Sequence, residues 1–221
     1  MINENIITLK KLGVEYTSHI KGMLAASSAG LFERKNELLH RVIDEEERAA
    51  NLMDLNIEER AINAIAKYQP VAGNLRMIIS IMKMSNSLER IGDHCVNISQ
   101  SAFILNRYPP LKPYIDLPKM KDTVVEMLVE ASEALLEVNS DKAKKVYFMD
   151  DIVDGYKKNI KTDLIEYIEK DSGNALRAVE ILNISGNLER VGDLITNMCE
   201  DIIYMKDGDI IRHGNKIITP P

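Results

Sequence analysis

The sequence predicts an all-α protein of six long helices, arranged as two tandem, sequence-related three-helix bundles. Three observations carry this prediction: the amino-acid composition, the placement of proline and an internal repeat. The chain has 221 residues, of which 45% are hydrophobic, but only 5% are aromatic and none is tryptophan. Leu, Ile, Val, Met and Ala must therefore fill the interior, which favours interdigitated helices over sheets rich in aromatic and β-branched residues.

Prolines divide the chain into two helical bodies. Four of the seven prolines fall in the segment YPPLKPYIDLP, whereas residues 1–69 and 119–219 contain none. Because proline is costly inside a helix, long proline-free runs joined by a proline-rich segment indicate two helical bodies and a stiff connector. We therefore predict a first three-helix repeat at 1–108, a connector at 109–118, a second three-helix repeat at 119–206 and a C-terminal tail at 207–221.

Apolar residues recur at helical spacing within each body. The first helix opens on an i, i+3, i+4, i+7 track formed by Ile6, Leu9, Gly13, Tyr16 and Ile20. The next two helices are expected at about 36–67 and from Gly73 to about Asn106. The apolar stripe of the second helix is predicted to comprise Leu39, Val42, Ile43, Leu52, Leu55 and Ile62. The second body repeats this plan at roughly 117–138, 141–169 and 174–206.

The third helices of the two bodies share a sequence motif. A shift of one hundred positions places SNSLERIGDHCVN at 85–97 on SGNLERVGDLITN at 185–197. The shared residues form the pattern L-E-R-[IV]-G-D-x-x-x-N without a gap. Agreement of this kind in a single register indicates an internal duplication.

The repeated motif places carboxylates on one helical face. Glu89 and Asp93 are four residues apart, as are Glu189 and Asp193, so the Cβ atoms of each pair lie ~5–6 Å from one another. Because two carboxylates at this spacing repel, a hard cation, a basic partner or solvation must compensate.

The helix before the motif carries a further pair in each body. Asp150 and Asp154 are four residues apart in the second body, and Glu47 and Asn51 occupy the aligned positions in the first. Packed together, the second and third helices of a body offer four oxygen-bearing side chains. Such a set suits Mg²⁺, Mn²⁺, Ca²⁺ or iron, whereas Zn²⁺ sites usually include Cys or His. A solvated acidic stripe on the bundle surface is the competing interpretation.

Glycine and arginine within the motif carry expectations of their own. Gly92 and Gly192 lie in mid-helix, where Gly costs ~1 kcal/mol relative to Ala, so we expect each to allow close approach of a neighbouring helix. Arg90 and Arg190 are expected to form solvated ion pairs with the aspartates three positions further on, in preference to contacts with an anion or a partner.

Charge and cysteine content exclude several classes of function. The net charge of −6 argues against a nucleic-acid binder, which needs a basic face, and against free inorganic phosphate as a direct ligand. Cys95 and Cys199 form no C-x-x-C pair and are predicted to be reduced core thiols.

The N-terminus has no apolar signal-peptide region, and no apolar run approaches the ~18 residues that span a bilayer. We therefore predict a cytoplasmic protein that reaches a membrane only through partners.

With its duplicated motif, the chain resembles the PhoU family over nearly its whole length. The resemblance rests on the repeated L-E-R-[IV]-G-D, on the segment AKYQPVAGNLR at 66–76 and on the connector PPLKP at 109–113. It implies two similar three-helix bundles and negative regulation of phosphate uptake and of the phosphate-starvation response. It also implies two partners that the protein couples, namely the ATPase of the phosphate ABC transporter and a sensor histidine kinase.

The resemblance further implies multinuclear metal sites held by E(D)-x-x-x-D motifs, with iron or zinc in some relatives. Carried over by position, the ligand candidates are Glu47, Glu89 and Asp93 in the first body and Asp150, Asp154, Glu189 and Asp193 in the second. Iron, zinc, manganese and magnesium are candidate ions, and no organic cofactor is expected. Asn51 departs from the family pattern because an amide supplies an oxygen but no charge. We therefore expect the second site to hold a divalent ion more tightly.

Other functions stay open at this point. A PhoU-like helical regulator of a different transporter, for sodium-coupled phosphate or for potassium, fits the same residues. A ferritin-like di-iron protein needs an E-x-x-H motif on each of two helices, and Glu37 with His40 forms the only one. No catalytic triad, P-loop or dinucleotide fingerprint is present, so we predict that the chain is not an enzyme.

The C-terminal tail at 207–221 is expected either to be loosely ordered or to join a contact between two copies, which makes a homodimer one expected assembly.

Overall fold

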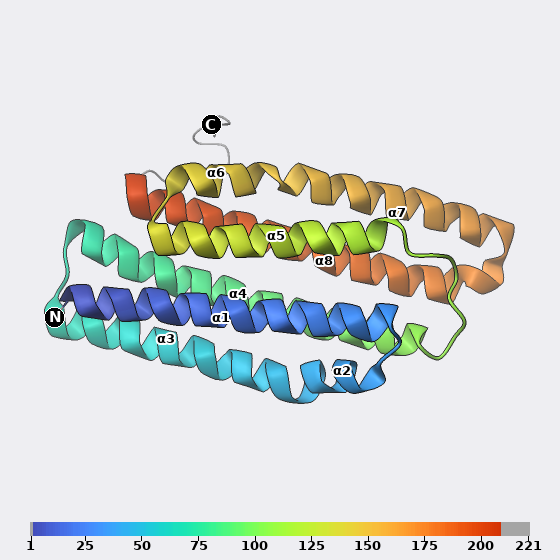
Figure 1. Cartoon of the computed structure of the whole chain (residues 1–221), viewed down its shortest axis with the longest axis horizontal. Coiled ribbons are helices and arrows are strands. Elements are labelled where there is room, and N and C mark those ends of the chain that lie inside the picture. Colours follow the sequence, from blue (N-terminus) through green and yellow to red (C-terminus); the bar gives the residue numbers. More distant parts are fainter. Residues whose placement is uncertain (1, 209–221) are drawn as a thin grey trace.

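A computed structural model describes residues 2–208 of the chain, and these residues form helices and no strand (Figure 1). The elements are α1 (Ile2–Phe32), α2 (Asn36–Arg41), the π-helical turn η1 (Val42–Glu46), α3 (Glu47–Tyr68), α4 (Ala72–Leu105), α5 (Asp116–Glu137), α6 (Ser140–Phe148), α7 (Asp150–Lys170), the 3₁₀ turn η2 (Ser172–Asn174) and α8 (Ala175–Asp207). Because α2, η1 and α3 follow one another directly and a single residue separates α6 from α7, the described chain builds six long rods. Of the predicted tail, residues 209–221 lie outside the described part.

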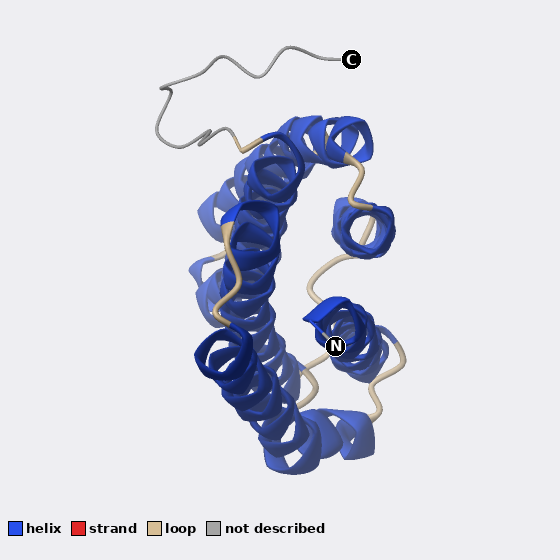
Figure 2. Ribbon diagram, turned by 90° about the vertical axis from the view of Figure 1, so that its left-hand side faces the viewer, coloured by secondary structure: helices blue, strands red, loops and turns tan. Residues whose placement is uncertain are grey.

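The six rods pair into two three-helix bundles. The first bundle packs α1 against α3 and α4, and the second packs α5 against α7 and α8. Figure 2 looks along the helices and shows a curved outer layer, with α1 and α5 packed on its concave side. The most extensive helix–helix contact in the described structure runs between α4 and α8 and joins the two bundles. The predicted fold class is therefore confirmed.

The interior is aliphatic, as the composition predicts. Tyr16 is the one aromatic side chain among the buried residues of the described chain. Cys95 and Cys199 are free and wholly buried, and burial raises the pKa of the Cys95 thiol to about 12. The expectation of core thiols is thus confirmed. No helix in the described part combines the length and the apolar character that a bilayer crossing requires.

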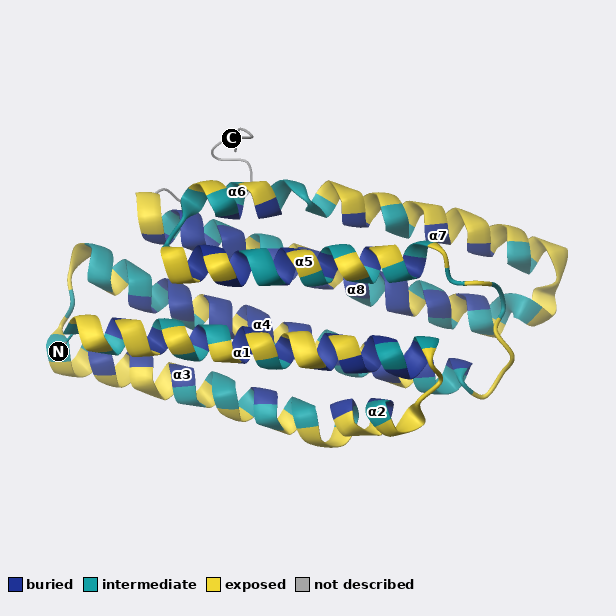
Figure 3. Cartoon of the chain, in the orientation of Figure 1, coloured by how far each residue is buried: buried dark blue, intermediate teal, exposed yellow. Residues whose placement is uncertain are grey.

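The predicted apolar stripe of α3 is partly wrong. Leu52, Leu55 and Ile62 point outward, with exposed fractions of 68%, 58% and 51%, and Figure 3 shows exposed residues along the outer helices. The buried face of α3 is instead formed by Ala50, Ile57, Ala61 and Ala64.

The correction follows from helical phase. Within α3, Ile57, Ala61 and Ala64 lie seven, eleven and fourteen residues after Ala50, about two, three and four whole turns, so all four face the same way. Leu55 lies five residues, nearly one and a half turns, after Ala50 and therefore faces away. Residue size misled the prediction, because small alanines occupy much of the inward face, where they let α3 pack closely against α1 and α4.

Candidate functional site

Two groups of acidic side chains lie at equivalent places in the two repeats. We call the first group the α3–α4 cluster; it comprises Glu47 and Asp54 of α3 with Glu89 and Asp93 of α4. The second group is the α7–α8 cluster, which comprises Asp150 and Asp154 of α7 with Glu189 and Asp193 of α8. Burial and the charges of the other carboxylates in the same group raise the pKa values of Glu89, Asp93, Asp150 and Asp193. The structure thus brings the predicted ligand candidates together within each repeat.

An irregular turn of helix precedes each cluster. In the first repeat the π-helical turn η1 ends directly before Glu47, whose N–H bonds to the carbonyl of Val42 five residues back. In the second repeat Met149 interrupts the helix directly before Asp150, and its N–H donates to the carbonyl of Val146 at 3.0 Å. Because the two interruptions occupy matching positions, each sets the direction of the first acid of its cluster. Single π-helical turns are frequent at functional sites.

The α3–α4 cluster contains one acid that the sequence prediction missed. Asp54 lies seven residues, about two turns, after Glu47 and therefore on the same face of α3. Its Oδ1 accepts a hydrogen bond from the Ser85 hydroxyl of α4 at 2.6 Å. Burial raises the pKa of Glu89, and the charges of Asp93 and Asp54 raise it further. The i+7 spacing was the signal in the sequence, but the search for acids ended at i+4.

Asn51 does not act as a neutral replacement for the missing acid in this structure. Its Nδ2 donates a hydrogen bond to Oε1 of Glu47 at 2.6 Å. The amide therefore supports one carboxylate of the α3–α4 cluster as a hydrogen-bond donor, and its nitrogen faces that carboxylate.

Asp150 of the α7–α8 cluster has a strongly raised pKa. Burial raises the pKa of Asp150 to about 7, and the negative charges of Asp193, Asp154, Asp151 and Glu189 add to the shift in that order. Its Oδ1 is buried and has no hydrogen-bond partner among the described residues. A buried carboxylate oxygen without a donor is costly, so this position favours a proton or a cation.

A lysine stands in the α7–α8 cluster where the first repeat has Asp54. Lys157 follows Asp150 by seven residues, as Asp54 follows Glu47. Its Nζ lies 2.8 Å from Oε1 of Glu189. One carboxylate of this cluster is therefore already partnered by a cationic side chain.

The two motif glycines differ in how closely a neighbouring helix approaches. A Cβ atom added to Gly192 would lie 2.6 Å from Oδ1 of Asp150, which is a clash. At Gly92 the added atom would meet Cδ1 of Ile20 at 3.4 Å and Cβ of Ala50 at 3.7 Å, close to ordinary contact. A neighbouring helix therefore approaches too closely for a side chain at Gly192, where the absence of a Cβ atom makes room for the Asp150 carboxylate. At Gly92 the approach leaves space for a Cβ atom.

The clusters supply suitable donors for a hard cation without forming a finished cage. Within residues 2–208, no three His, Cys, Asp or Glu side chains are arranged so that they could hold a metal ion as they stand. The donor chemistry nevertheless fits, because carboxylate oxygens are the usual ligands of Mg²⁺, Mn²⁺ and Ca²⁺. The unpartnered Oδ1 of Asp150 supports the same conclusion. Binding would require the exposed carboxylates to change rotamer.

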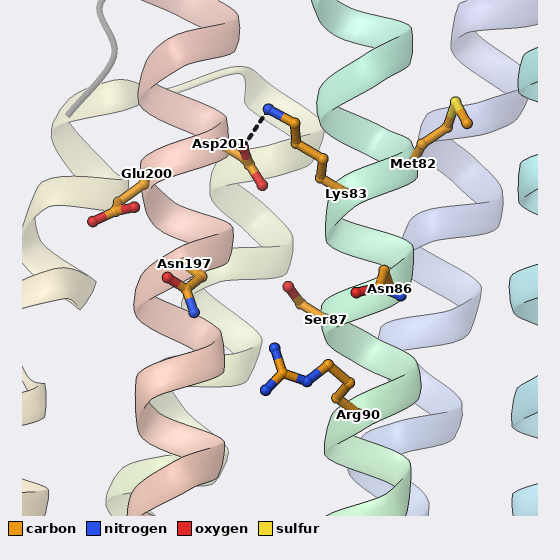
Figure 4. Close-up of a pocket in the computed structure, with 8 residues that line it drawn as sticks. All are labelled: Met82, Lys83, Asn86, Ser87, Arg90, Asn197, Glu200 and Asp201. Carbon is orange, nitrogen blue, oxygen red and sulfur yellow. Dashed lines mark ion pairs between the residues drawn. The ribbon is translucent and has the colours of Figure 1, made fainter. Parts of the chain in front are cut away.

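The motif arginines do not pair with the aspartates three positions further on. Neither the Arg90 nor the Arg190 guanidinium makes an ion pair or hydrogen bond with another described residue. Both instead line an open groove between α4 and α8, and Figure 4 shows Arg90 extending from α4 toward α8. The predicted ion pairs are therefore absent from the described chain.

Comparisons with known proteins agree with this architecture. A model of the PhoU domain matches residues 14–102 and again residues 117–202. The phosphate-specific transport system accessory protein PhoU homolog of Aquifex aeolicus is 33% identical over 95% of this chain and 91% of its own length. The corresponding accessory protein PhoU of Escherichia coli is 30% identical over 88% of this chain and 80% of its own.

A solved structure gives the same result in three dimensions. The crystal structure of PhoU from Pseudomonas aeruginosa superposes with a TM-score of 0.90 at 27% identity, covering 95% of this chain and all of that one. The family consists of accessory proteins rather than enzymes, which confirms the prediction of no catalytic activity. With the PhoU domain matched twice and relatives matched over most of its length, the chain belongs to the PhoU family.

Proposed function

We propose that this protein is a PhoU-type regulator of phosphate transport that acts as an accessory protein of a phosphate-specific transport system. The observation that carries the proposal is the match of two PhoU domains to most of the chain. Relatives named as accessory proteins of that transport system share up to 34% identity with it. The regulator acts by contact with other proteins, since the sequence offers no catalytic motif.

The regulation we propose is negative. The protein represses phosphate uptake and the phosphate-starvation response when phosphate is plentiful, by coupling the transporter ATPase to a sensor histidine kinase. The shape of the molecule supports a coupling role, because two similar bundles are joined side by side through α4 and α8 (Figure 1). Each bundle leaves a long outer surface on α3 or α7 for a different partner.

We further propose that the two acidic clusters bind iron, manganese, magnesium or zinc. Burial, and after it the charges of neighbouring carboxylates, raise the pKa values of Glu89, Asp93, Asp150 and Asp193, and a cation would relieve the repulsion between these charges. Carboxylates from two helices of one bundle would hold the ion and so fix the packing of those helices. Metal loading would thereby stiffen the surfaces offered to partners.

Gene deletion tests the regulatory role. Deleting the gene should leave phosphate-starvation genes switched on in phosphate-rich medium, and the intact gene supplied in trans should restore repression. Transcript levels of those genes at high and low phosphate give the measurement. Unchanged repression in the deletion strain would contradict the proposal. A change confined to sodium-coupled phosphate transport or to potassium uptake would favour the alternative in which the chain regulates another transporter.

Pull-down experiments test the two partners separately. Tagged protein should retain the transporter ATPase and the sensor kinase from solubilised membranes. Retention of the ATPase alone would restrict the function to the transporter. Retention of neither, in a strain where deletion abolishes repression, would show that regulation runs through another partner.

A further inference from the structure

We propose that the groove between α4 and α8 contains a binding site for a small oxyanion, held between Arg90 and Arg190. One pocket of this groove, which we call the seam pocket, has a volume of about 350 Å³. It is lined by Arg90, His94, Arg190, Asp193, Leu194 and Asn197. The two arginines come from equivalent positions of the two repeats, so duplication of the motif has placed two guanidinium groups at one pocket.

The two guanidinium groups are available for a ligand. Neither Arg90 nor Arg190 makes an ion pair or a hydrogen bond within the described chain, although their charges offset part of the rise that burial and neighbouring carboxylates cause in the pKa values of Asp93 and Asp193. Two like charges lining one pocket repel each other, and an anion between them removes that repulsion. The guanidinium group presents a planar fork of donors that matches the oxygens of phosphate or carboxylate groups.

Side chains from both helices set the shape of the seam pocket. Nδ1 of His94 on α4 lies 2.8 Å from Oδ1 of Asn187 on α8, which ties the two helices together at the pocket and orients the imidazole ring. Asn197 of α8 lines the same pocket and carries an amide that can donate to an anion. The site is therefore built on two rigid helices that belong to the largest interface of the fold.

The neighbouring part of the groove contains a lysine that already has a partner. A second pocket of about 580 Å³ shares Arg90 and Asn197 with the first and continues along α4 and α8 (Figure 4). There Lys83 pairs with the buried Asp201, its Nζ lying 3.6 Å from Oδ1. Because this lysine is already partnered, the two arginines of the seam pocket are the cationic groups of the groove that an anion can engage.

This site differs from what the net charge of the chain suggests. The overall charge is −6, but a small ion responds to the charges within about one Debye length, ~10 Å at 0.1 M salt. Asp193 also lines the seam pocket, and its negative charge weakens the attraction, so we expect modest affinity. The ligand class is an oxyanion, either free inorganic phosphate or a carboxylate.

Side-chain NMR offers a direct test on the full-length protein. The Nε–Hε signals of arginine are followed while sodium phosphate replaces sodium chloride at constant ionic strength, and sodium acetate is titrated in a parallel experiment. The Arg90 and Arg190 signals should shift in a saturable way with phosphate or acetate. Tighter binding of phosphate identifies the free ion as the ligand class, and tighter binding of acetate identifies a carboxylate.

Matched variants locate the site. Arg90→Gln and Arg190→Gln should each weaken binding about tenfold, the effect of one charge-assisted contact. Arg107→Gln removes the same charge at the C-terminal end of α4, outside the groove, and should leave the affinity unchanged. Both groove arginines are exposed, so the variants should fold, which circular dichroism checks. The proposal is overturned if phosphate and acetate produce no saturable shift, or if Arg90→Gln and Arg190→Gln bind as tightly as Arg107→Gln.

Discussion

The α3–α4 and α7–α8 clusters descend from one motif but differ in charge and burial. Each contains four carboxylates, yet the second also contains Lys157, which pairs with Glu189. The first has Asp54 at the matching position. When only the predicted ligand candidates are counted, the second repeat has more acids, and this count predicted that the second site binds a divalent ion more tightly. With Asp54 and Lys157 included, the α3–α4 cluster carries the larger negative charge, and we now expect it to bind a divalent ion more tightly.

The two clusters also differ in how deeply their carboxylates are buried. The α7–α8 cluster contains Asp150, whose pKa is raised to about 7 and whose Oδ1 has no partner in the described chain. Gly192 leaves the space that this carboxylate occupies. The first repeat places Ile20 and Ala50 around the equivalent Gly92. Duplicated motifs can thus keep the same residues while different packing gives those residues different neighbours and pKa values.

The largest expected effect concerns the two glycines. Gly192→Leu should destabilise the protein by ~1–3 kcal/mol, because the new side chain must displace Asp150 and overpack the α7–α8 contact. Gly92→Ala should instead stabilise it by up to ~1 kcal/mol through helix propensity, since its Cβ meets near-ordinary contacts. Chemical denaturation of the metal-free proteins measures both changes. A stabilising effect of Gly192→Leu, or a destabilising effect of Gly92→Ala, would contradict the packing difference between the repeats.

The second prediction concerns the order of metal binding. Asp54→Asn should weaken Mn²⁺ binding to the α3–α4 cluster about tenfold, because one charge leaves an oxygen donor set. Glu58→Gln, an exposed change one turn further along α3, serves as the control. Calorimetric titration, with anomalous diffraction at limiting Mn²⁺ to assign the clusters, gives the measurement. Preferential filling of the α7–α8 cluster in the unaltered protein would restore the order expected from the motif alone.

The third prediction is a pH dependence specific to the second repeat. Because the folded-state pKa of Asp150 is about 7 and an unfolded aspartate titrates near 4, the folded state binds more protons between these values. The metal-free protein should therefore lose stability as pH rises from about 4 to about 7. Asp150→Asn removes this loss and should stabilise the protein above pH 7 by ~1 kcal/mol, after allowance for solvent screening.

Two comparisons test that pH effect. Asp151→Asn changes the exposed neighbouring residue and should alter the pH profile much less. Thermal unfolding in the presence of a chelator, at several pH values, gives the profiles. A parallel pH dependence of the Asp150→Asn variant and the unaltered protein would show that this carboxyl titrates as an ordinary exposed acid.

The smallest expected effect comes from the lysine. Lys157→Gln frees Glu189 and should strengthen Mn²⁺ binding to the α7–α8 cluster about threefold to fivefold, in keeping with the modest free energy of a partly exposed ion pair. Lys158→Gln changes an exposed residue next to it and should have little effect. Calorimetric titration of the two variants makes the comparison. Equal gains would indicate a general change in surface charge instead of release of one ligand.

Much of the fold could be predicted from the sequence because its signals are local. Proline placement indicated a connector at 109–118, and apolar periodicity indicated the helices. The helix α5 begins within the predicted connector, at Asp116, because proline is tolerated in the first turn of a helix, where Pro118 lies. The duplicated motif indicated an internal duplication, and the structure places Glu89 and Glu189 at the contact between the second and third rods of their repeats. Helical spacing also identified most acids of the two clusters, since positions four apart on a helix share a face.

The sequence by itself therefore determined the helices, their duplication and the face on which the paired acids lie. The tertiary structure alone decided that Ala61 faces inward while Leu55 faces water, that Asp54 joins one cluster while Lys157 partners the other, and that the motif arginines turn toward the α4–α8 groove. The physical reason is that periodicity orders residues around one helix axis. Which side chains meet between helices depends on the rotation and axial register of each rod against its neighbours, and long-range packing sets both.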